Sequence, residues 1–422
     1  MTFDNFAVAH HAVLWTILIV AMVMGAVVNK TNFCTMGAVS DLVNIGDSGR
    51  MRGWLFAMTV ALLGVIFLEA SQLINVDASR PPYRAPNFAW IEYLVGGILF
   101  GVGMTLGSGC GNKTLIRIGG GNLKSIVVFA VIAVSAYFMV NPFPGTDKTI
   151  YSEVFYRWTN TLNISLAHKQ DLGSFVNQVV PGMDVITLRL ILGGIIGVAL
   201  LVFIFKSADF RSRFDNILGG ATVGVAVLVA WYISAAMVTV VAGEDKYSWT
   251  QYTGDDVWVM LETNERPQDV AIQSFSFINP IGQVLRYGLN SFDERFLTFG
   301  VVSVFGIILG SLLWAVVSRG FRIEWFASVR DFFSHVAGGV LMGIGGILAL
   351  GCTIGQAVTG ASTLALGSFI AFAGIVLGSA LTMKVQYYKM VYEGEATFGS
   401  ALITSLVELR MLPASFRKHA KV

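Results

Sequence analysis

Three cysteines are the residues of this chain whose type and spacing could do chemistry. The 422 residues contain only Cys34, Cys110 and Cys352. A thiol donates and accepts weak hydrogen bonds, whereas a thiolate is a nucleophile and a ligand for soft metals. The cysteines could therefore donate weak hydrogen bonds to a ligand, act as nucleophiles or hold a metal ion.

A metal centre and a disulfide scaffold both fit this set of cysteines poorly. A tetrahedral thiolate site needs a fourth ligand, and no histidine or further cysteine stands near any of the three in the sequence. Three is an odd number for a set of disulfides, and none of the cysteines lies in a polar loop. A single Cys34–Cys110 bridge remains open as an alternative. We expect no metal and no cofactor.

Two of the cysteines end two copies of one apolar, glycine-rich motif. Residues 96–110 recur as residues 338–352 at a constant offset of 242 (352 minus 110), and eight of the fifteen positions are identical. Small residues at helical spacing let helices pack closely in lipid. Gly109 and Gly351, directly before the cysteines, differ because they stand where a span ends, which favours a break in the helix beside a site.

The composition and the uncharged stretches predict an all-α integral membrane protein. Apolar residues make up 55% of the chain and charged residues 13%, against roughly 25% charged residues in soluble domains. A transmembrane helix needs about 20 apolar residues, and none of the residues between Asp331 and Lys384 is charged. We expect about nine transmembrane helices, at 8–28, 53–74, 90–109, 123–141, 186–206, 216–241, 296–318, 332–351 and 363–382. Shorter apolar segments at 33–44, 111–120, 270–290 and 353–361 are expected to be re-entrant or broken helices.

Loop charges predict which way the helices run. Lys and Arg concentrate in the loops after the first, third, fifth and seventh spans and in the C-terminal tail, which are therefore expected to be cytoplasmic. The acidic loops 142–185 and 243–269 are expected outside, and the loop 75–89, with Arg80 and Arg84, is the one exception to the pattern. The N-terminus is then outside and the C-terminus cytoplasmic. The two motif copies form inverted pseudo-repeats, a common transporter architecture.

This arrangement divides the chain into two transmembrane halves. We expect residues 1–141 to form the first half, 142–185 an extracytoplasmic loop, 186–206 a linking span, and 207–422 the second half with its loop 243–269. The basic residues are scattered among loops, so no nucleic-acid partner is expected. Gly119-Gly120-Gly121 lacks the Gly-Lys-Ser/Thr ending of a phosphate loop, which argues against nucleotide hydrolysis.

The candidate site consists of the cysteines and the small or polar residues next to them. Helices that begin after Cys110 and Cys352 would point unpaired N–H groups, and roughly half a positive charge each, towards an anion. Lys113 could draw an anion to the cytoplasmic mouth, or could simply anchor its helix by the positive-inside rule. The predicted substrate-binding residues are Cys34, Cys110, Cys352, Gly109, Gly111, Asn112, Lys113, Gly351, Thr353 and Gln356, and no catalytic residue is assigned.

The same residues carry a resemblance to a known family. In residues 32–41, 96–110 and 338–355 the chain resembles the YeeE/YedE sulfur-transport family of thiosulfate uptake membrane proteins. The resemblance implies a bacterial inner-membrane transporter or channel, not an enzyme, that imports thiosulfate or a related sulfur anion through a cysteine-lined constriction near the bilayer midplane. Its partners would be that anion, the lipid bilayer and, as a candidate, a cytoplasmic sulfur-carrier protein.

Electrostatics favours neutral thiols along such a path. A thiolate about 4 Å from a dianion would repel it by about 8 kcal/mol at an effective dielectric constant of about 20. Burial favours the neutral thiol, a weak donor that can release the ion again. Two alternatives stay open: a membrane sulfurtransferase that takes sulfane sulfur onto Cys110 or Cys352, which would need a thiolate in a cationic setting, and a transporter of another sulfur or selenium species.

Overall fold

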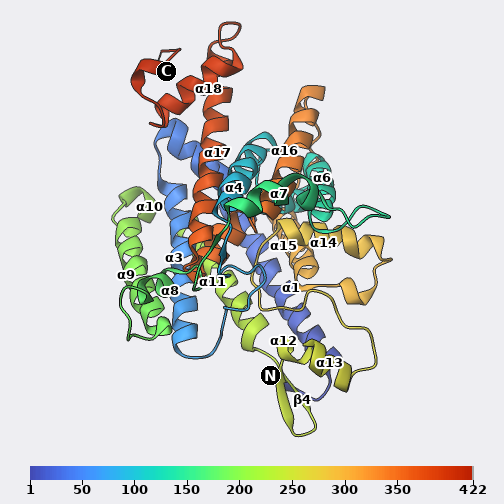
Figure 1. The fold of residues 1–422 in the computed structure, drawn as a ribbon. Coiled ribbons are helices and arrows are strands. Elements are labelled where there is room, and N and C mark those ends of the chain that lie inside the picture. The colour runs from blue at the N-terminus through green and yellow to red at the C-terminus, as the bar shows by residue number, and fades with distance from the viewer. Residues whose placement is uncertain (421–422) are drawn as a thin grey trace.

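The computed structural model describes residues 1–420 as a helical bundle with very little sheet (Figure 1). Within this described part of the chain, nine helices are long and apolar enough to cross a membrane, which confirms the predicted spans. They are α1 (Phe6–Thr31), α3 (Gly49–Ala70), α4 (Trp90–Leu106), α6 (Leu123–Val140), α9 (Val185–Phe205), α11 (Phe214–Ala236), α15 (Phe299–Val317), α16 (Val329–Leu348) and α17 (Leu366–Val391). The chain is an all-α integral membrane protein.

The remaining elements are short. The α-helices are α2 (Thr35–Ser40), α5 (Gly111–Gly119), α7 (Tyr156–Thr159), α8 (Leu172–Asn177), α10 (Ala208–Ser212), α12 (Trp249–Tyr252), α13 (Asp255–Leu261), α14 (Ile278–Leu289) and α18 (Phe398–Glu408). The π-helical and 3-10 turns are η1 (Asp41–Ile45), η2 (Tyr151–Phe155), η3 (Asn160–Leu162), η4 (Glu294–Phe296), η5 (Ile354–Gly360), η6 (Ala361–Thr363) and η7 (Ala414–Phe416). Three of the predicted short segments are confirmed, because α2 with η1, α5, and η5 lie directly after the three cysteines.

The fourth short segment, 270–290, is only partly helical. Residues 270–277 have no helical structure, and α14 begins at Ile278. Pro280 lies in the first turn of α14, where its missing N–H costs no intrahelical hydrogen bond. Apolar composition alone does not distinguish a buried extended segment from a buried helix, which is why the prediction was wrong over the first eight residues of this segment.

Two predicted spans have different ends in the structure. The sixth was predicted to reach 241 but ends at Ala236, because Thr239–Ala242 (β4) pairs with Asp245–Ser248 (β5) and with the N-terminal strand Thr2–Phe3 (β1). The ninth continues nine residues beyond 382, and its Lys384 forms an ion pair with Glu408 of α18. In both cases partners distant in sequence decide where the helix ends.

One further strand pair, Asn87–Phe88 (β2) with Ile164–Ser165 (β3), joins two loops at the same end of the bundle.

Capping side chains fix the first turns of several spans. Asn5, Asn122, Asp184, Thr298 and Ser328 each accept a hydrogen bond from a backbone N–H at the start of α1, α6, α9, α15 and α16, respectively. These short polar side chains satisfy donors that a helix leaves unpaired at its N-terminus. In these five spans the capping residue directly precedes the first helical residue.

The two motif copies pack against each other in antiparallel order. A Cβ atom on Gly96 would lie 2.5 Å from the nitrogen of Ala349, and a Cβ atom on Gly103 would lie 2.7 Å from the carbonyl oxygen of Gly338. Early residues of α4 therefore lie beside late residues of α16. The glycines permit this backbone contact, and the inverted orientation of the two copies is confirmed.

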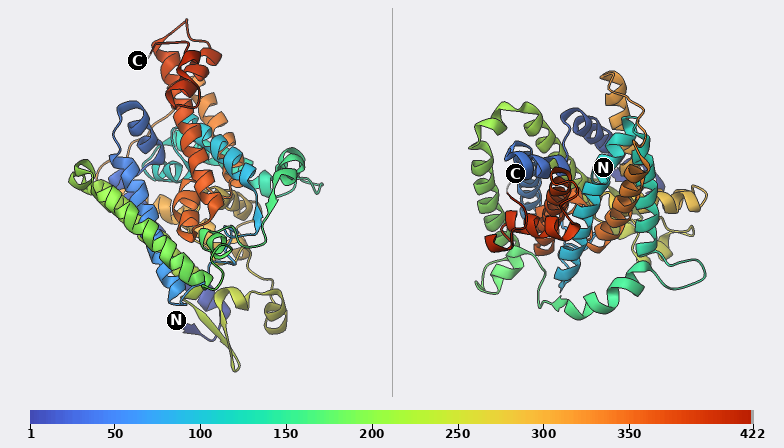
Figure 2. Two further views of the ribbon diagram at one scale, coloured as in Figure 1. Left: turned by 60° about the vertical axis from the view of Figure 1, so that its left-hand side comes forward. Right: turned by 90° about the horizontal axis from the view of Figure 1, so that it is seen from above.

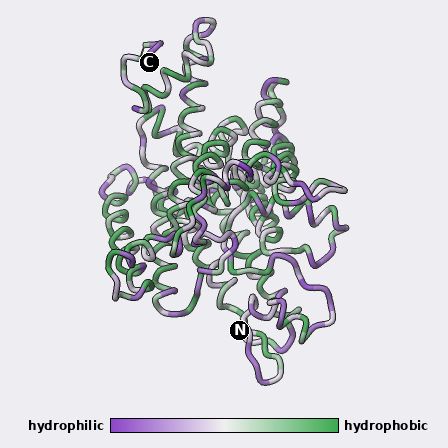
Figure 3. The backbone as a smooth tube through the Cα atoms, viewed as in Figure 1, coloured by the Kyte–Doolittle hydropathy of each residue, from purple (hydrophilic) through white to green (hydrophobic). Residues whose placement is uncertain are grey.

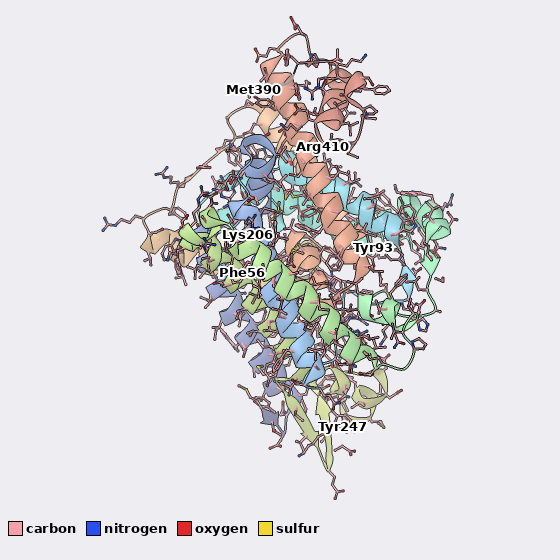
Figure 4. All side chains as sticks on the ribbon, turned by 90° about the vertical axis from the view of Figure 1, so that its left-hand side faces the viewer. Phe56, Tyr93, Lys206, Tyr247, Met390 and Arg410 are labelled. Carbon is pink, nitrogen blue, oxygen red and sulfur yellow. The ribbon has the colours of Figure 1, made fainter. Side chains whose placement is uncertain are left out.

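The termini lie at opposite ends of the bundle (Figure 1). The N-terminal end carries the β4–β5 hairpin with α12 and α13, and the other end carries the extension of α17 and α18 (Figure 2). Apolar residues dominate the helices in between, while polar residues gather in the loops (Figure 3). Tyr247 on the hairpin and Met390 and Arg410 near the C-terminus mark the two ends (Figure 4).

Candidate functional site

The three cysteines come from separate segments and lie close together inside the protein. Their exposed fractions are 7% for Cys34, 2% for Cys110 and 0% for Cys352. All three are free thiols, so the alternative Cys34–Cys110 disulfide is not formed. Cys110 is within electrostatic range of both other cysteines, and the hydroxyl of Thr353 lies beside its thiol. The structure therefore brings together the three residues that the sequence selected.

Equivalent turns after α4 and α16 make this convergence possible. Because the two helices are antiparallel, their C-terminal ends point in opposite directions along the bundle. Ser108 (φ 59°) and Leu350 (φ 57°) both adopt the left-handed conformation that ends each helix and turns the chain. The two residues are related by the same offset of 242 (350 minus 108). The repeat thus duplicates the turn that directs each following cysteine inward, although neither left-handed residue is a glycine.

The predicted residue Lys113 lies at the edge of the thiol cluster. Its ammonium donates a hydrogen bond to Oδ1 of Asn32, at the end of α1. The same ammonium is within electrostatic range of Cys34 and Cys110. A cation in this position can stabilise an anion beside these two thiols. The position agrees with the functional interpretation of Lys113 as well as with that of a helix anchor.

The predicted glycines Gly109, Gly111 and Gly351 leave space at the site. A Cβ atom on Gly109 would lie 2.9 Å from Cγ of Lys113, and one on Gly111 would lie 2.9 Å from Cδ1 of Ile278. A Cβ atom on Gly351 would be 3.3 Å from the carbonyl carbon of Gly355. Larger residues at the first two positions would force the neighbouring side chains to move.

Polar atoms without partners cluster in the segments that follow the cysteines. Asn112, Thr353 and Gln356 are 2%, 0% and 0% exposed. Within residues 1–420, Asn112 Oδ1, Thr353 Oγ1 and Gln356 Oε1 have no hydrogen-bond partner, and neither has Oγ1 of Thr35, the residue after Cys34. A buried unsatisfied polar atom costs about 1–3 kcal/mol. Several of them beside three thiols are typical of a place where a polar ligand or water completes the bonding.

Sequence reasoning missed Ser276, which lies beside the thiol of Cys352. A Cβ atom on Gly355 would approach Ser276 Oγ to 2.5 Å, so this glycine keeps the space around the hydroxyl open. The signal was present in the repeat, because Ser276 is the counterpart of Cys34 at the offset of 242, and Phe275 is the counterpart of Phe33. The site therefore contains two pairs, Cys34 with Cys110 and Ser276 with Cys352.

Tyr83 is the second residue that sequence reasoning missed. Its hydroxyl donates a hydrogen bond of 2.8 Å to the carbonyl oxygen of Gly355. Burial, together with the nearby Cys352 thiol, raises the pKa of Tyr83 above its usual value, so the phenol remains a neutral donor. No local pattern in the loop 75–89 indicates this hydrogen bond. The bond holds the segment after Cys352 to that loop.

A cavity of about 570 Å³ connects the loop 75–89 with this site. Its wall includes Ser276 and Gly351 of the site and, from the loop, residues 77–82 and Ala85. This volume lies within the usual range for small-molecule sites. Cys352 does not line the cavity, but Ser276 in its wall lies beside the Cys352 thiol.

The fold and the site together define a polytopic membrane transport protein. Inverted repeats whose broken helices meet at a buried polar site are the architecture of many transporters. Comparison with known proteins gives the particular class: the family model described as "Sulphur transport" matches residues 30–381, and the chain belongs to this family.

Two curated relatives cover nearly the whole chain. The first, named thiosulfate transporter TsuA, from Escherichia coli (strain K12), is 25% identical over 371 residues, which are 86% of this chain and 91% of the relative. The second, with the same name, from Spirochaeta thermophila, is 24% identical over 378 residues, which are 87% of this chain and 97% of the relative. This chain is thus similar to thiosulfate transporters along most of its length.

Proposed function

We propose that this protein imports thiosulfate through a narrow path lined by Cys34, Cys110 and Cys352. The names of both relatives support the substrate. The observation that carries the path is the convergence of three free, buried thiols from three segments. Thiosulfate is a dianion with a soft terminal sulfur, which suits weak contacts with sulfur groups.

The neighbours of each thiol suggest the order in which the ion meets them. From the cavity of about 570 Å³ it first reaches Ser276 and Cys352. Thr353 then stands beside Cys110, and Lys113 lies by Cys110 and Cys34 at the far end. Neutral thiols and hydroxyls donate weak hydrogen bonds without the repulsion of about 8 kcal/mol expected between a thiolate and the dianion. Weak contacts in series let the ion enter and leave again.

The loop charges support the direction of the path. We place the cavity on the periplasmic side of a bacterial inner membrane, with the N-terminus outside and the C-terminus in the cytoplasm. Gly109, Gly111, Asn112, Gly351 and Gln356 complete the proposed binding residues. A cytoplasmic sulfur-carrier protein would be the partner that receives sulfur at the inner end.

The experiment is thiosulfate uptake by cysteine variants. Single replacements of Cys34, Cys110 or Cys352 by alanine should fold normally and reduce growth on thiosulfate as sole sulfur source, and uptake of labelled thiosulfate into liposomes should fall in parallel. Ser303→Ala is the matched control, because it removes a small buried hydroxyl on α15 that bonds only to the Phe299 carbonyl in the described chain. Unchanged uptake in all three cysteine variants would overturn the proposal.

A sulfurtransferase is the second candidate, and the cation beside two thiols is the observation that favours it. A Cys110 thiolate would attack the outer sulfur of thiosulfate, the S–S bond would break, and the products would be a cysteine persulfide and sulfite. Serine at position 110 would abolish this reaction but retain part of a hydrogen-bonding role. Mass spectrometry after exposure to thiosulfate distinguishes the two, because only the transferase leaves a persulfide adduct.

A further inference from the structure

The wall of the outer cavity contains two carboxylates and one exposed arginine. The charged residues that line the cavity of about 570 Å³ are Asp77, Arg80 and Asp269. Formally this wall carries one net negative charge, which would repel a dianion. Whether an ion in the cavity meets this net negative charge depends on the ion-pair partners of Asp77, Arg80 and Asp269.

Both carboxylates are compensated by cations outside the cavity. Asp77 lies 2.9 Å from Arg84, 3.2 Å from Arg189 and 2.6 Å from Lys169. Burial raises the pKa of Asp77, but its hydrogen bond with Lys169 and the charges of Arg84 and Arg189 lower it to about 2. The carboxylate therefore stays ionised. Arg84 also pairs with Glu69 and Arg189 with Asp171, so the three cations balance three carboxylates.

The second carboxylate, Asp269, is compensated in the same way. It forms an ion pair with Arg286 and accepts a further hydrogen bond of 3.3 Å from Nε2 of Gln283. Neither carboxylate thus presents an uncompensated negative charge to the cavity.

Arg80 differs from both. Its side chain is exposed, and in the described part of the chain no carboxylate lies within ion-pair distance of its guanidinium. Its backbone N–H is fixed by a hydrogen bond of 2.9 Å to the carbonyl of Ile272. Arg80 also lines a second hollow of about 760 Å³, so its side chain borders both hollows.

We propose that Arg80 captures the anionic substrate at the outer mouth. This inference rests on the proposed function and deepens it. A guanidinium stays positively charged at any working pH and therefore attracts a dianion. Because the side chain is exposed and lies at the mouth, its effect is on association and apparent affinity, not on passage between the thiols.

The test compares Arg80→Gln with Arg157→Gln in thiosulfate uptake by liposomes. Arg157 is an exposed arginine of α7 that does not line either hollow, and β2–β3 pairing joins its loop to the loop of Arg80 at the same end. At low salt, Arg80→Gln should raise the KM for thiosulfate about tenfold, the factor given by Coulomb's law for a dianion about 6 Å from one charge in water. The maximal rate should stay unchanged, and Arg157→Gln should behave like the wild type.

Two further measurements vary the salt concentration and the residue at position 80. The difference between wild type and Arg80→Gln should shrink as salt is raised to about 1 M, because screening removes the attraction. Arg80→Lys should recover most of the affinity. An Arg80→Gln variant with wild-type KM at low salt overturns this inference alone, while the cysteine variants still report on the path. A wild-type protein that carries no thiosulfate overturns the proposed function and this inference with it.

Discussion

Replacement of Arg84 by methionine is expected to destabilise the protein and to slow transport. Arg84 belongs to the loop 75–89, the loop that broke the positive-inside pattern, and its side chain is fully buried. It donates to both carboxylate oxygens of Glu69, at 2.6 and 2.8 Å, and to Asp77 at 2.9 Å. Its Nε donates to the carbonyl of Thr363 at 2.9 Å. This arginine therefore joins the loop 75–89 to α3 and to the turn after η5.

The magnitude follows from what remains when Arg84 is removed. Glu69 would keep only Arg189 within range, at 3.9 Å, and would lose two short charge-assisted hydrogen bonds. Removing one partner of a buried ion pair costs about 3–5 kcal/mol. Tyr83, the residue before Arg84, holds the carbonyl of Gly355, so a loosened loop should also disturb the segment after Cys352.

Thermal unfolding in detergent, with thiosulfate uptake measured in parallel, tests this prediction. Arg84→Met should lower the unfolding free energy by about 3–5 kcal/mol, and Glu69→Met alone should also be destabilising. The double variant removes both charges and should recover at least half of the loss, since Asp77 keeps Arg189 and Lys169. An Arg84→Met protein as stable as the wild type would refute the reasoning, and so would strictly additive losses in the double variant.

Four further predictions concern the site and its supports. Ser276→Ala should reduce uptake while Ser276→Cys retains it, because the side chain beside Cys352 acts as a small donor. Lys113→Met should slow uptake with little change in stability, because it removes the cation beside Cys34 and Cys110; uptake rate and thermal unfolding measure the two effects. Gly338→Ala should cost about 1–3 kcal/mol, since its Cβ atom would lie 2.5 Å from the nitrogen of Gly107, and unfolding in detergent measures the loss. Asp77 has a pKa of about 2 in the folded protein and about 3.9 when unfolded, so its stabilisation is present above about pH 4 and lost as the pH falls towards 2; Asp77→Asn should remove this part of the acid-side loss in a pH series of unfolding measurements.

The spans and the cysteine-bearing breaks could be predicted because their signals are local. A helix in lipid must be apolar over its own length. Helices such as α15 and α16 can therefore be predicted from their own residues, without knowledge of their neighbours. The turns after α4 and α16 could be predicted because the repeat contains the same pattern twice, ending on Cys110 and Cys352. The inverted orientation followed from counting spans, and the contact of Gly103 with Gly338 agrees with it.

The contacts between the site and the loop 75–89 could not be predicted because their determinants are distant in sequence. Arg84 is an exception to the loop-charge rule, and its ion pairs with Glu69 and Asp77 explain why a cation is placed there. The contact between Tyr83 and Gly355 joins residues 272 positions apart. Ser276 could have been found from the offset of 242, but a serine in place of a cysteine is conspicuous only once the other copy of the site is known.

The repeat duplicates Cys110 as Cys352 but does not duplicate the residues beside them. We expect this difference to affect the rates of anion binding and release, and not the direction of net transport. At the offset of 242, Cys34 corresponds to Ser276 and Lys113 to Gly355. In the proposed path, a cation near Cys34 and Cys110, without a counterpart at Gly355, would make the two ends hold an anion with unequal strength and release it at unequal rates. Both ends nevertheless exchange with the same ion in solution, so unequal binding cannot shift its equilibrium across the membrane. A protein that relies on this asymmetry alone equilibrates thiosulfate, and any accumulation inside liposomes above the outside concentration would have to come from a coupled ion gradient.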